Sequence, residues 1–311
     1  MHPAWSVIVF TTVSGAAQGL VVLLALCTLL GVPMAPMLVS GSLFLTLVML
    51  VTGLGASFLH LGHPLRAWRA VAMWRTSWLS REVIVLPAFI AVVGVWWLTF
   101  QWTGTSAPWL KALPWLVLAL AALLWLCTAM IYACIRFIAE WAHPITVVYY
   151  GLMGLASGAL LASAGAALAG ETPLARGLVP LTAVLVLGAW ALRCITLKRN
   201  QGLKPASTLR SATGLPGTPV VQKSMGMSAG SFNTREFFHG ASAAAVRHVR
   251  LALHGLCFLL PALLLAAVWA GGPIALLPLA LLVHVPGLLA ERWLFFAQAR
   301  HPQNLYYQQV S

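Results

Sequence analysis

The sequence has very few acidic residues and no aspartate. Five glutamates supply all its carboxylate side chains in 311 residues, and charged residues of both signs make up 7% of the chain. A soluble domain typically carries about 25% charged residues, so a soluble fold of this length could not cover its surface. A disordered chain is excluded as well, because such chains are poor in apolar residues, whereas 61% of this sequence is hydrophobic.

Cysteine is also scarce, and no two cysteines form a C-x-x-C pair. The five cysteines lie in or at the ends of apolar segments, at Cys27, Cys127, Cys134, Cys194 and Cys257. Iron–sulfur clusters and structural zinc sites need clustered thiolates, so we expect neither in this chain. The expected role of these side chains is to pack between helices as small hydrophobic groups.

Long apolar runs are abundant. A bilayer core of about 30 Å needs about 20 apolar residues in a helix, and eight stretches qualify: 5–30, 36–61, 83–100, 113–135, 147–168, 178–197, 251–269 and 273–289. The runs are continuous and lack the period-2 alternation of membrane strands. We therefore predict an all-α polytopic integral membrane protein, a single domain over residues 1–311 built as a bundle of eight transmembrane helices.

The basic residues are distributed unevenly. Eight spans place both termini on one side, with the loops 62–82, 136–146 and 198–250 and the tail from residue 290. Lys111 and Arg176 lie on the other side, which leaves sixteen of the 18 lysines and arginines on the side of the termini or at its helix ends. Lysine and arginine gather on the cytoplasmic side of a membrane, so we predict cytoplasmic termini. In this setting the net charge of +13 reports topology, and we expect no nucleic-acid partner.

The segment between the second and third spans is the densest in polar chemistry. It leaves the second span at His60 and enters the third at Glu82, and Gly62 and Pro64 break the helix between them. An ionisable group beside hydrocarbon is costly unless it is paired. A histidine and a carboxylate at this boundary suit a quinone headgroup, which needs hydrogen bonds and a proton path. An interfacial connector with no chemical role remains the alternative.

The loop 198–250 is long, basic and rich in glycine and proline at its centre. Loops of this length are usually functional or disordered, and Phe232, Phe237 and Phe238 are unusual in a disordered linker. We predict a docking surface for a cytoplasmic partner, with a solvated linker near anionic lipid as the alternative.

Few ionisable groups fall inside the predicted spans, and the exceptions are His284 and His254. A b-type haem in a bundle needs two axial histidines at similar depth on facing helices. These two differ in depth by several residues and form a poor axial pair, although a pairing of either with His60 stays open. We expect packed or hydrogen-bonded histidines rather than haem or another metal site.

Several stretches resemble the DmsC/SoeC family, the membrane anchor subunits of molybdopterin iron–sulfur oxidoreductases. Residues 59–67 (Leu-His-Leu-Gly-His-Pro-Leu-Arg-Ala) and 80–82 (Ser-Arg-Glu) resemble the anchor of bacterial dimethyl-sulfoxide reductase. Residues 1–8, 73–89, 130–136 and 230–240 are more similar to the SoeC type, the anchor of the cytoplasmic sulfite-oxidising enzyme. The resemblance spans most of the chain.

The resemblance implies a heterotrimer in the bacterial inner (cytoplasmic) membrane. One partner would hold molybdopterin guanine dinucleotide, a second would hold iron–sulfur clusters, and the eight-helix anchor would exchange electrons with ubiquinone or menaquinone, normally without haem. The quinone-site residues of such anchors fall here on His60, Gly62, Arg66 and Glu82. In this interpretation His60 hydrogen-bonds the headgroup and Glu82 relays a proton, with Arg66 or Arg81 tuning the pKa of Glu82.

The charge distribution bears on the choice within the family. The connector that resembles the quinone site lies on the predicted cytoplasmic side, whereas the sulfoxide reductase has periplasmic catalytic subunits. We therefore predict the quinone-reducing anchor of a sulfite dehydrogenase. The alternatives are a quinol-oxidising anchor of a DMSO reductase-type enzyme, an anchor containing haem b, and a transporter or assembly protein without a redox role.

Overall fold

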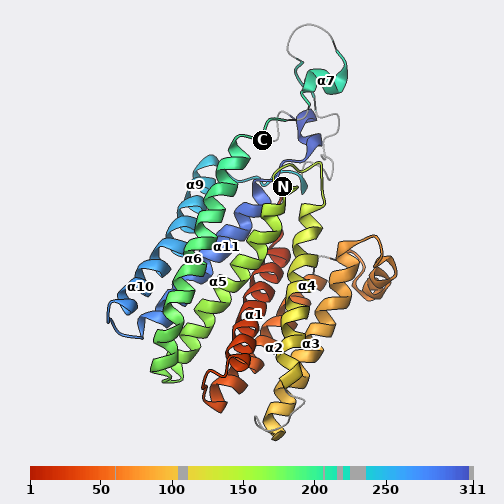
Figure 1. The fold of residues 1–311 in the computed structure, drawn as a ribbon. Coiled ribbons are helices and arrows are strands. Elements are labelled where there is room, and N and C mark those ends of the chain that lie inside the picture. Colours follow the sequence, from red (N-terminus) through yellow and green to blue (C-terminus); the bar gives the residue numbers. More distant parts are fainter. Residues whose placement is uncertain (60, 104–110, 206, 216–219, 225–235, 308–311) are drawn as a thin grey trace.

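The computed structural model describes residues 1–59, 61–103, 111–205, 207–215, 220–224 and 236–307. It contains eight helices that are long and apolar enough to cross a membrane. They are α1 (Trp5–Leu29), α2 (Pro36–Phe58), α3 (Trp78–Thr103), α4 (Leu113–Ala133), α5 (Pro144–Leu168), α6 (Thr172–Gln201), the composite span Ala243–Trp269, and α11 (Leu276–Ala297). The predicted all-α bundle of eight spans is confirmed, and both termini lie at the same end of it (Figure 1).

The composite span has three parts. It begins with α9 (Ala243–Ala252), continues as a π-helical turn η3 (Leu253–Leu259) and ends with α10 (Leu260–Trp269). A Cβ on Gly287 of α11 would lie 2.1 Å from the backbone nitrogen of Cys257. The π-helical turn therefore packs directly against the backbone of α11, and only a glycine fits at that contact.

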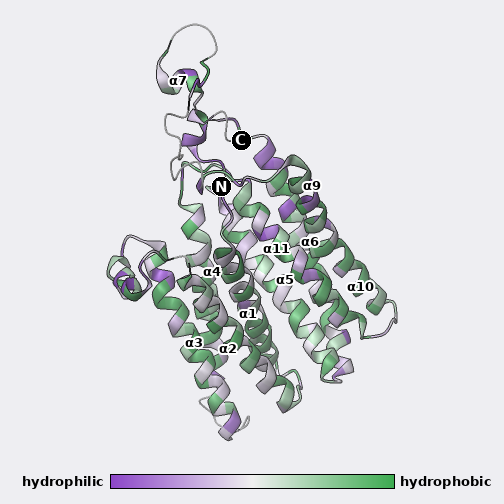
Figure 2. Ribbon diagram, turned by 180° about the vertical axis from the view of Figure 1, so that it is seen from behind, coloured by the Kyte–Doolittle hydropathy of each residue, from purple (hydrophilic) through white to green (hydrophobic). Residues whose placement is uncertain are grey.

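Helix α1 forms the centre of the bundle. It packs against α2, α4, α5 and α11, and its residues from Ala16 to Ala25 are all buried. A helix that is apolar on every face belongs in the interior of a fold. The other spans bury one face and expose the rest, which Figure 2 shows as hydrophobic ribbon along the outer helices.

Glycines allow α1 and α5 to touch at the backbone. A Cβ on Gly158 would lie 2.1 Å from the carbonyl carbon of Gly19, and a Cβ on Gly19 would lie 1.9 Å from the carbonyl oxygen of Gly154. Because lipid chains are as apolar as the helices, membrane helices associate through such close van der Waals packing of small residues. This crossing fixes α1 against α5 close to the polar residues Ser14, Gln18 and Ser157.

The eighth span is longer than predicted. The apolar run ends before Glu291 and Arg292, so the sequence placed these residues in the tail. In the structure α11 continues to Ala297 and both side chains are buried. Helix α6 likewise extends beyond residue 197, to Gln201. The prediction that the tail begins at residue 290 is wrong, because pairing with Arg193 of α6 makes burial of the two charges within the helix tolerable.

The connector between α2 and α3 contains a 3₁₀ helix, η1 (Pro64–Met73), with no buried residue. It projects from the side of the bundle and is more hydrophilic than the spans (Figures 1 and 2). Trp68 and Trp74 are 70% and 51% exposed. Exposed tryptophans beside arginines are typical of a segment at the membrane–water interface.

A small cap closes the end that bears the termini. The N-terminal ammonium of Met1 donates to the carbonyl oxygens of Ala297 and Ala299. The ring of Phe237 stacks on His301 at 3.8 Å between centroids. The Phe238 ring meets Tyr307 edge-on at 6.4 Å. The cap also includes a short helix η4 (Pro302–Tyr306).

Two of the three phenylalanines that motivated the docking interpretation therefore pack on this chain's own tail. Phe232 lies outside the described residues. The rest of the described loop is mostly exposed and includes the five-residue helix α7 (Leu209–Thr213).

Candidate functional site

Glu82 is buried near the start of α3. The side chain is 5% exposed, and the hydroxyl of Thr128 on α4 donates a hydrogen bond to its carboxylate. Both residues lie near the helix ends on the side of the termini. A carboxyl group near such a helix end can hold a proton and pass it on, since the bond from Thr128 leaves acceptor capacity on both oxygens.

Arg81 braces the turn that leads into α3. Its Nε donates to the carbonyl oxygen of Trp74 at 2.9 Å, and its Nη2 donates to the carbonyl oxygen of Arg75 at the same distance. The guanidinium also lies 4.1 Å from the centroid of the Trp78 ring. These contacts fix the junction between η1 and α3 and thereby the position of Glu82.

The structure shows no hydrogen bond or ion pair between Glu82 and the other described residues of the predicted site. His60 lies outside the described residues. Gly62 and Arg66 are exposed in the connector, and a Cβ on Gly62 would meet nothing within 4 Å. Within the described part of the chain, no ion pair joins Glu82 to Arg66 or Arg81. Thr128, the observed partner of Glu82, was not identified from the sequence, because a lone threonine in an apolar span gives no distinctive pattern.

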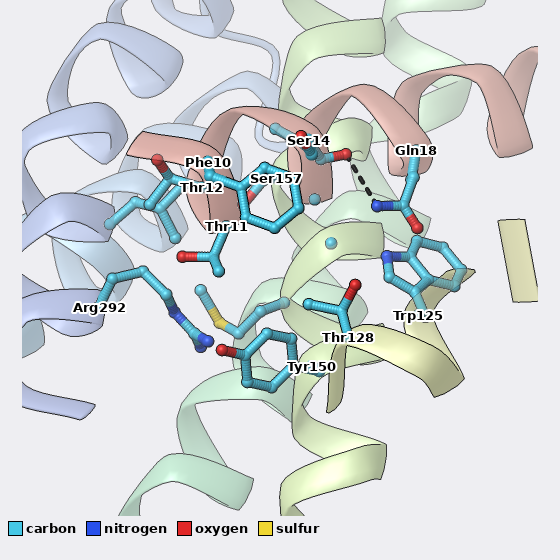
Figure 3. Close-up of a pocket in the computed structure, with 15 residues that line it drawn as sticks. Phe10, Thr11, Thr12, Ser14, Gln18, Trp125, Thr128, Tyr150, Ser157 and Arg292 are labelled. Carbon is cyan, nitrogen blue, oxygen red and sulfur yellow. Dashed lines mark hydrogen bonds between the residues drawn. The ribbon is translucent and has the colours of Figure 1, made fainter. Parts of the chain in front are cut away.

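A small polar cavity lies beside Thr128, between α1, α4, α5 and α11 (Figure 3). Its volume is about 20 Å³. The polar residues around it include Ser14, Gln18, Trp125, Thr128, Tyr150 and Arg292. A cavity needs about 10–15 Å³ to hold one water, whereas small-molecule pockets measure about 300–1,000 Å³. The cavity therefore suits water and is too small for a quinone ring.

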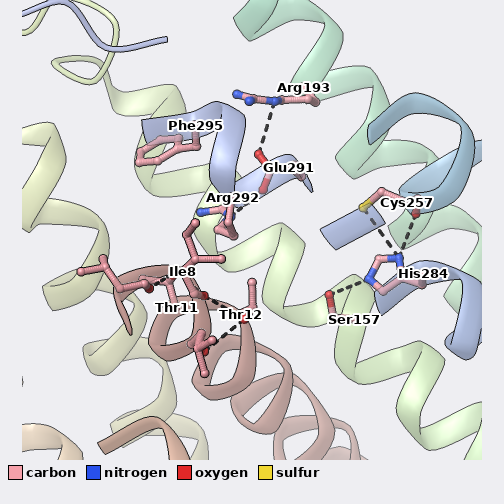
Figure 4. A network of polar contacts seen from close by, with 12 residues as sticks. Ile8, Thr11, Thr12, Ser157, Arg193, Cys257, His284, Glu291, Arg292 and Phe295 are labelled. Atoms are coloured by element: carbon pink, nitrogen blue, oxygen red, sulfur yellow. Dashed lines mark hydrogen bonds and ion pairs between the residues drawn. The ribbon is translucent and has the colours of Figure 1, made fainter. Parts of the chain in front are cut away.

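A cluster of buried charges adjoins the cavity (Figure 4). Glu291 pairs with Arg193 through one oxygen and with Arg292 through the other. All three side chains are at most 3% exposed. The guanidinium of Arg292 also lies 4.5 Å from the centroid of the Tyr150 ring. Two arginines and one glutamate leave one net positive charge inside the bundle.

The sequence contained a signal for this cluster that the apolar-run criterion did not use. The residues that follow Arg292 are Trp293, Leu294, Phe295 and Phe296, so the hydrophobic segment resumes after the two charges. A charged pair with apolar residues on both sides is typical of a helix that continues and buries the pair.

The buried His284 and the half-buried His254 are both engaged in hydrogen bonds. The Nε2 atom of His284 lies 2.9 Å from the Ser157 hydroxyl, and its Nδ1 atom lies 2.8 Å from the Cys257 carbonyl oxygen (Figure 4). The Nδ1 atom of His254 accepts from the indole of Trp190 at 3.0 Å. Both ring nitrogens of His284 therefore have a partner, as expected of a packed histidine. To bind a haem iron, His284 would have to give up one of these partners.

A larger groove lies at the opposite end of the bundle. It is open, has a volume of about 780 Å³, and lies between α2 and α3, with Phe44, Trp97 and Gln101 among its lining residues. Gln101 lies nineteen residues after Glu82 on the same helix, which corresponds to about 28 Å at 1.5 Å per residue. The groove is therefore separate from the site around Glu82.

Comparison with known proteins gives consistent matches. The family model described as DMSO reductase anchor subunit (DmsC) matches residues 1–297. The sequence is 46% identical over 327 aligned residues to a sulfite dehydrogenase subunit of Allochromatium vinosum, with 100% of both proteins covered. It is also similar to two Escherichia coli proteins. The anaerobic dimethyl sulfoxide reductase protein YnfH is 35% identical over 130 residues, covering 41% of this chain and 44% of that one. A second anaerobic dimethyl sulfoxide reductase protein is 30% identical over 188 residues, covering 59% and 64%.

Proposed function

This chain belongs to the DmsC family of membrane anchor subunits, and we propose that it is the anchor and quinone-binding subunit of a heterotrimeric sulfite dehydrogenase. The full-length identity with a sulfite dehydrogenase subunit supports this assignment. The similarity to the two dimethyl sulfoxide reductase proteins covers less of each sequence. The observation that carries the quinone site is the buried carboxyl of Glu82, held by Thr128 at the end of the bundle that bears the termini.

The proposed partners are a molybdopterin subunit and an iron–sulfur subunit on the cytoplasmic face of a bacterial inner membrane. The end that bears the termini is rich in exposed basic residues, among them Lys198, Arg247, Arg250 and Arg300. This end includes the described parts of the loop between α6 and α9. Exposed basic residues on the cytoplasmic side suit both anionic lipid and an acidic protein surface. This end is the proposed docking surface.

The overall chemistry balances on one side of the membrane. Two-electron oxidation of sulfite takes an oxygen atom from water and releases two protons. Reduction of quinone to quinol takes up two electrons and two protons. The cofactors of the partner subunits supply the electrons. This chain contributes binding, orientation and proton delivery. If sulfite is oxidised and quinone protonated from the same side, the reaction moves no net charge across the bilayer.

Glu82 is the proposed proton donor to the quinone headgroup. His60 is proposed to form a hydrogen bond with the same headgroup. Gly62 and Arg66 would line the approach from the connector that contains η1, whose exposed apolar side chains suit a position at the membrane–water interface. Arg81 acts as a positioning residue, because its guanidinium holds the carbonyl groups of the turn that precedes α3.

The Glu82→Gln variant in the assembled complex tests the proposal. We expect quinone reduction to fall by about 100-fold or more, the usual loss when a general acid is removed. Sulfite oxidation with an artificial electron acceptor should stay at the wild-type rate, because the amide leaves the fold and the partners unchanged. Glu171→Gln, at the opposite end of the bundle, is the matched control and should retain both activities. Wild-type quinone reduction in Glu82→Gln would contradict the assignment.

The family match also permits the opposite electron direction, in which quinol is oxidised and a sulfoxide is reduced. The same carboxyl would then accept a proton from quinol. Turnover assays on the purified complex separate the two directions, because only one pair, sulfite with quinone or quinol with dimethyl sulfoxide, should support catalysis at a substantial rate.

A further inference from the structure

Four polar atoms face the small cavity without a hydrogen-bond partner among the described residues. They are Gln18 Oε1, Trp125 Nε1, the Tyr150 hydroxyl and Arg292 Nη2, and each is inaccessible from outside. Buried polar atoms are almost always paired with protein or with ordered water. The four atoms come from four helices and belong to residues that line about 20 Å³ of space, which is enough for about one water with three or four partners.

Thr128 connects this cavity to Glu82. A threonine hydroxyl has one donor and two acceptor lone pairs. Its donor is used by the Glu82 carboxylate, so its lone pairs are available to accept from a molecule in the cavity that it lines. Thr11 and Thr12 also line the cavity, but their hydroxyls already donate to carbonyl oxygens of their own helix. Thr128 is therefore distinguished by its donation to a titratable group.

The charge cluster orients what the cavity holds. The guanidinium of Arg292 lies on the cavity wall, and the hydroxyl of Tyr150 points toward that guanidinium (Figure 3). A fixed positive charge attracts the oxygen of a water and turns its hydrogens toward acceptors on the opposite side. The acceptors there include Gln18 Oε1 and the lone pairs of Thr128.

We propose that this cavity binds an ordered water and that the water relays protons to Glu82 through the Thr128 hydroxyl. After Glu82 gives its proton to the quinone, its carboxylate takes the hydroxyl proton of Thr128, and Thr128 takes a proton from the water. A proton from bulk water on the side of the termini then restores the cavity water. This proton passes Tyr150 on its way to the cavity. The Tyr150 ring stacks on that of the half-buried Tyr132, near the end of α4, with 5.7 Å between the ring centroids. The proposal rests on the quinone-reducing function proposed above.

Two variants test the relay in the intact complex. Thr128→Val removes the hydroxyl with little change of shape, and Tyr150→Phe removes the entry hydroxyl without touching Glu82. We expect each to slow quinone reduction by about tenfold and to raise its solvent hydrogen–deuterium isotope effect. Sulfite oxidation with an artificial acceptor should not change. Thr128→Ser should restore the rate, because it restores the hydroxyl. Thr46→Val is the control, since Thr46 is fully buried on α2 and its hydroxyl bonds only its own helix.

The outcomes separate this inference from the proposed function. Wild-type quinone reduction in Glu82→Gln would remove the proposed function and the relay together. Loss in Glu82→Gln with a wild-type rate and isotope effect in both relay variants would overturn the relay alone. Loss in Thr128→Val without any change in Tyr150→Phe would assign Thr128 to positioning and would also overturn the relay. A structure of the complex at a resolution that resolves water should show density bound by Arg292 and Gln18, and an empty cavity there would contradict the proposal.

Discussion

Glu291 on α11 lies 3.3 Å from Arg193 on α6, measured between Oε1 and Nε, and neither side chain has any exposed surface. Helices α6 and α11 come from separate parts of the chain, so this contact joins two spans across the bundle. Arg292 binds the other oxygen of the same carboxylate. The cluster therefore places one negative and two positive charges in a region where every unpaired charge is costly.

Replacing Glu291 with leucine should strongly destabilise the bundle. The variant leaves two buried guanidinium groups without an anion, and breaking a buried ion pair in this way costs about 3–5 kcal/mol. Thermal unfolding in detergent should show a clearly lower melting temperature than wild type. Glu171→Gln should unfold at the wild-type temperature, because Glu171 lies at the end of the bundle remote from the cluster. Equal melting temperatures for both variants would mean that the cluster does not hold α6 to α11.

The eight spans could be predicted from the sequence because each one is a long apolar run, and hydrocarbon admits few other structures. The end of α11 could not be predicted in this way. Glu291 and Arg292 read as the start of a tail until Arg193 is placed beside them, and that contact joins positions about a hundred residues apart. The ion pairs of Glu291 offset the cost of burying these charges, and the sequence alone does not show which residues are paired.

The candidate site was predicted in part for a similar reason. Glu82 stood out because it is one of five carboxylates in the chain and begins an apolar span. Its partner Thr128 did not, since threonine hydroxyls in membrane helices usually bond their own backbone, as Thr46 does. The cavity depends on side chains from four helices, and no local sequence pattern encodes such a meeting.

Gly158→Ala should disrupt the contact between α1 and α5. The added Cβ would lie 2.1 Å from the backbone of Gly19, so the two helices must separate, and overpacking of this kind costs about 1–3 kcal/mol or more. Gly151→Ala on the same helix is the matched control, because its Cβ would meet nothing within 4 Å. Yield and melting temperature of the two variants in detergent provide the measurement. A stable Gly158→Ala protein with wild-type packing would contradict the close crossing.

The cap at the termini should loosen in acid. Burial lowers the pKa of His301 and of His239 below the ordinary value of 6.5, and the nearby Met1 ammonium lowers each further. With a lowered pKa the folded cap binds fewer protons than the open one, so this stabilisation is present above about pH 6.5 and is lost as the pH falls through the folded pKa values. Backbone hydrogen exchange of residues 236–241 should therefore be faster at about pH 5 than at about pH 8, after correction for intrinsic rates. In His301→Phe, which keeps the stack on Phe237 without a titratable ring, this pH dependence should shrink. Identical pH dependence in the variant and wild type would exclude His301 as a contributor.

Topology reporters should place the termini in the cytoplasm and residue 172 in the periplasm. Both termini lie at one end of the bundle (Figure 1), and residue 172 begins α6 at the other end. The sequence assigns sixteen of the 18 basic residues to the side of the termini, and short basic loops are retained on the cytoplasmic side. A fusion at the C-terminus should therefore be active with a cytoplasmic reporter and inactive with a periplasmic one, and a fusion at 172 should show the reverse.

The result also bears on the partners, because Glu82 and the cap lie on the side of the termini. A periplasmic signal from the C-terminus would move the docking surface to the outside and would favour the sulfoxide-reducing arrangement over sulfite oxidation in the cytoplasm.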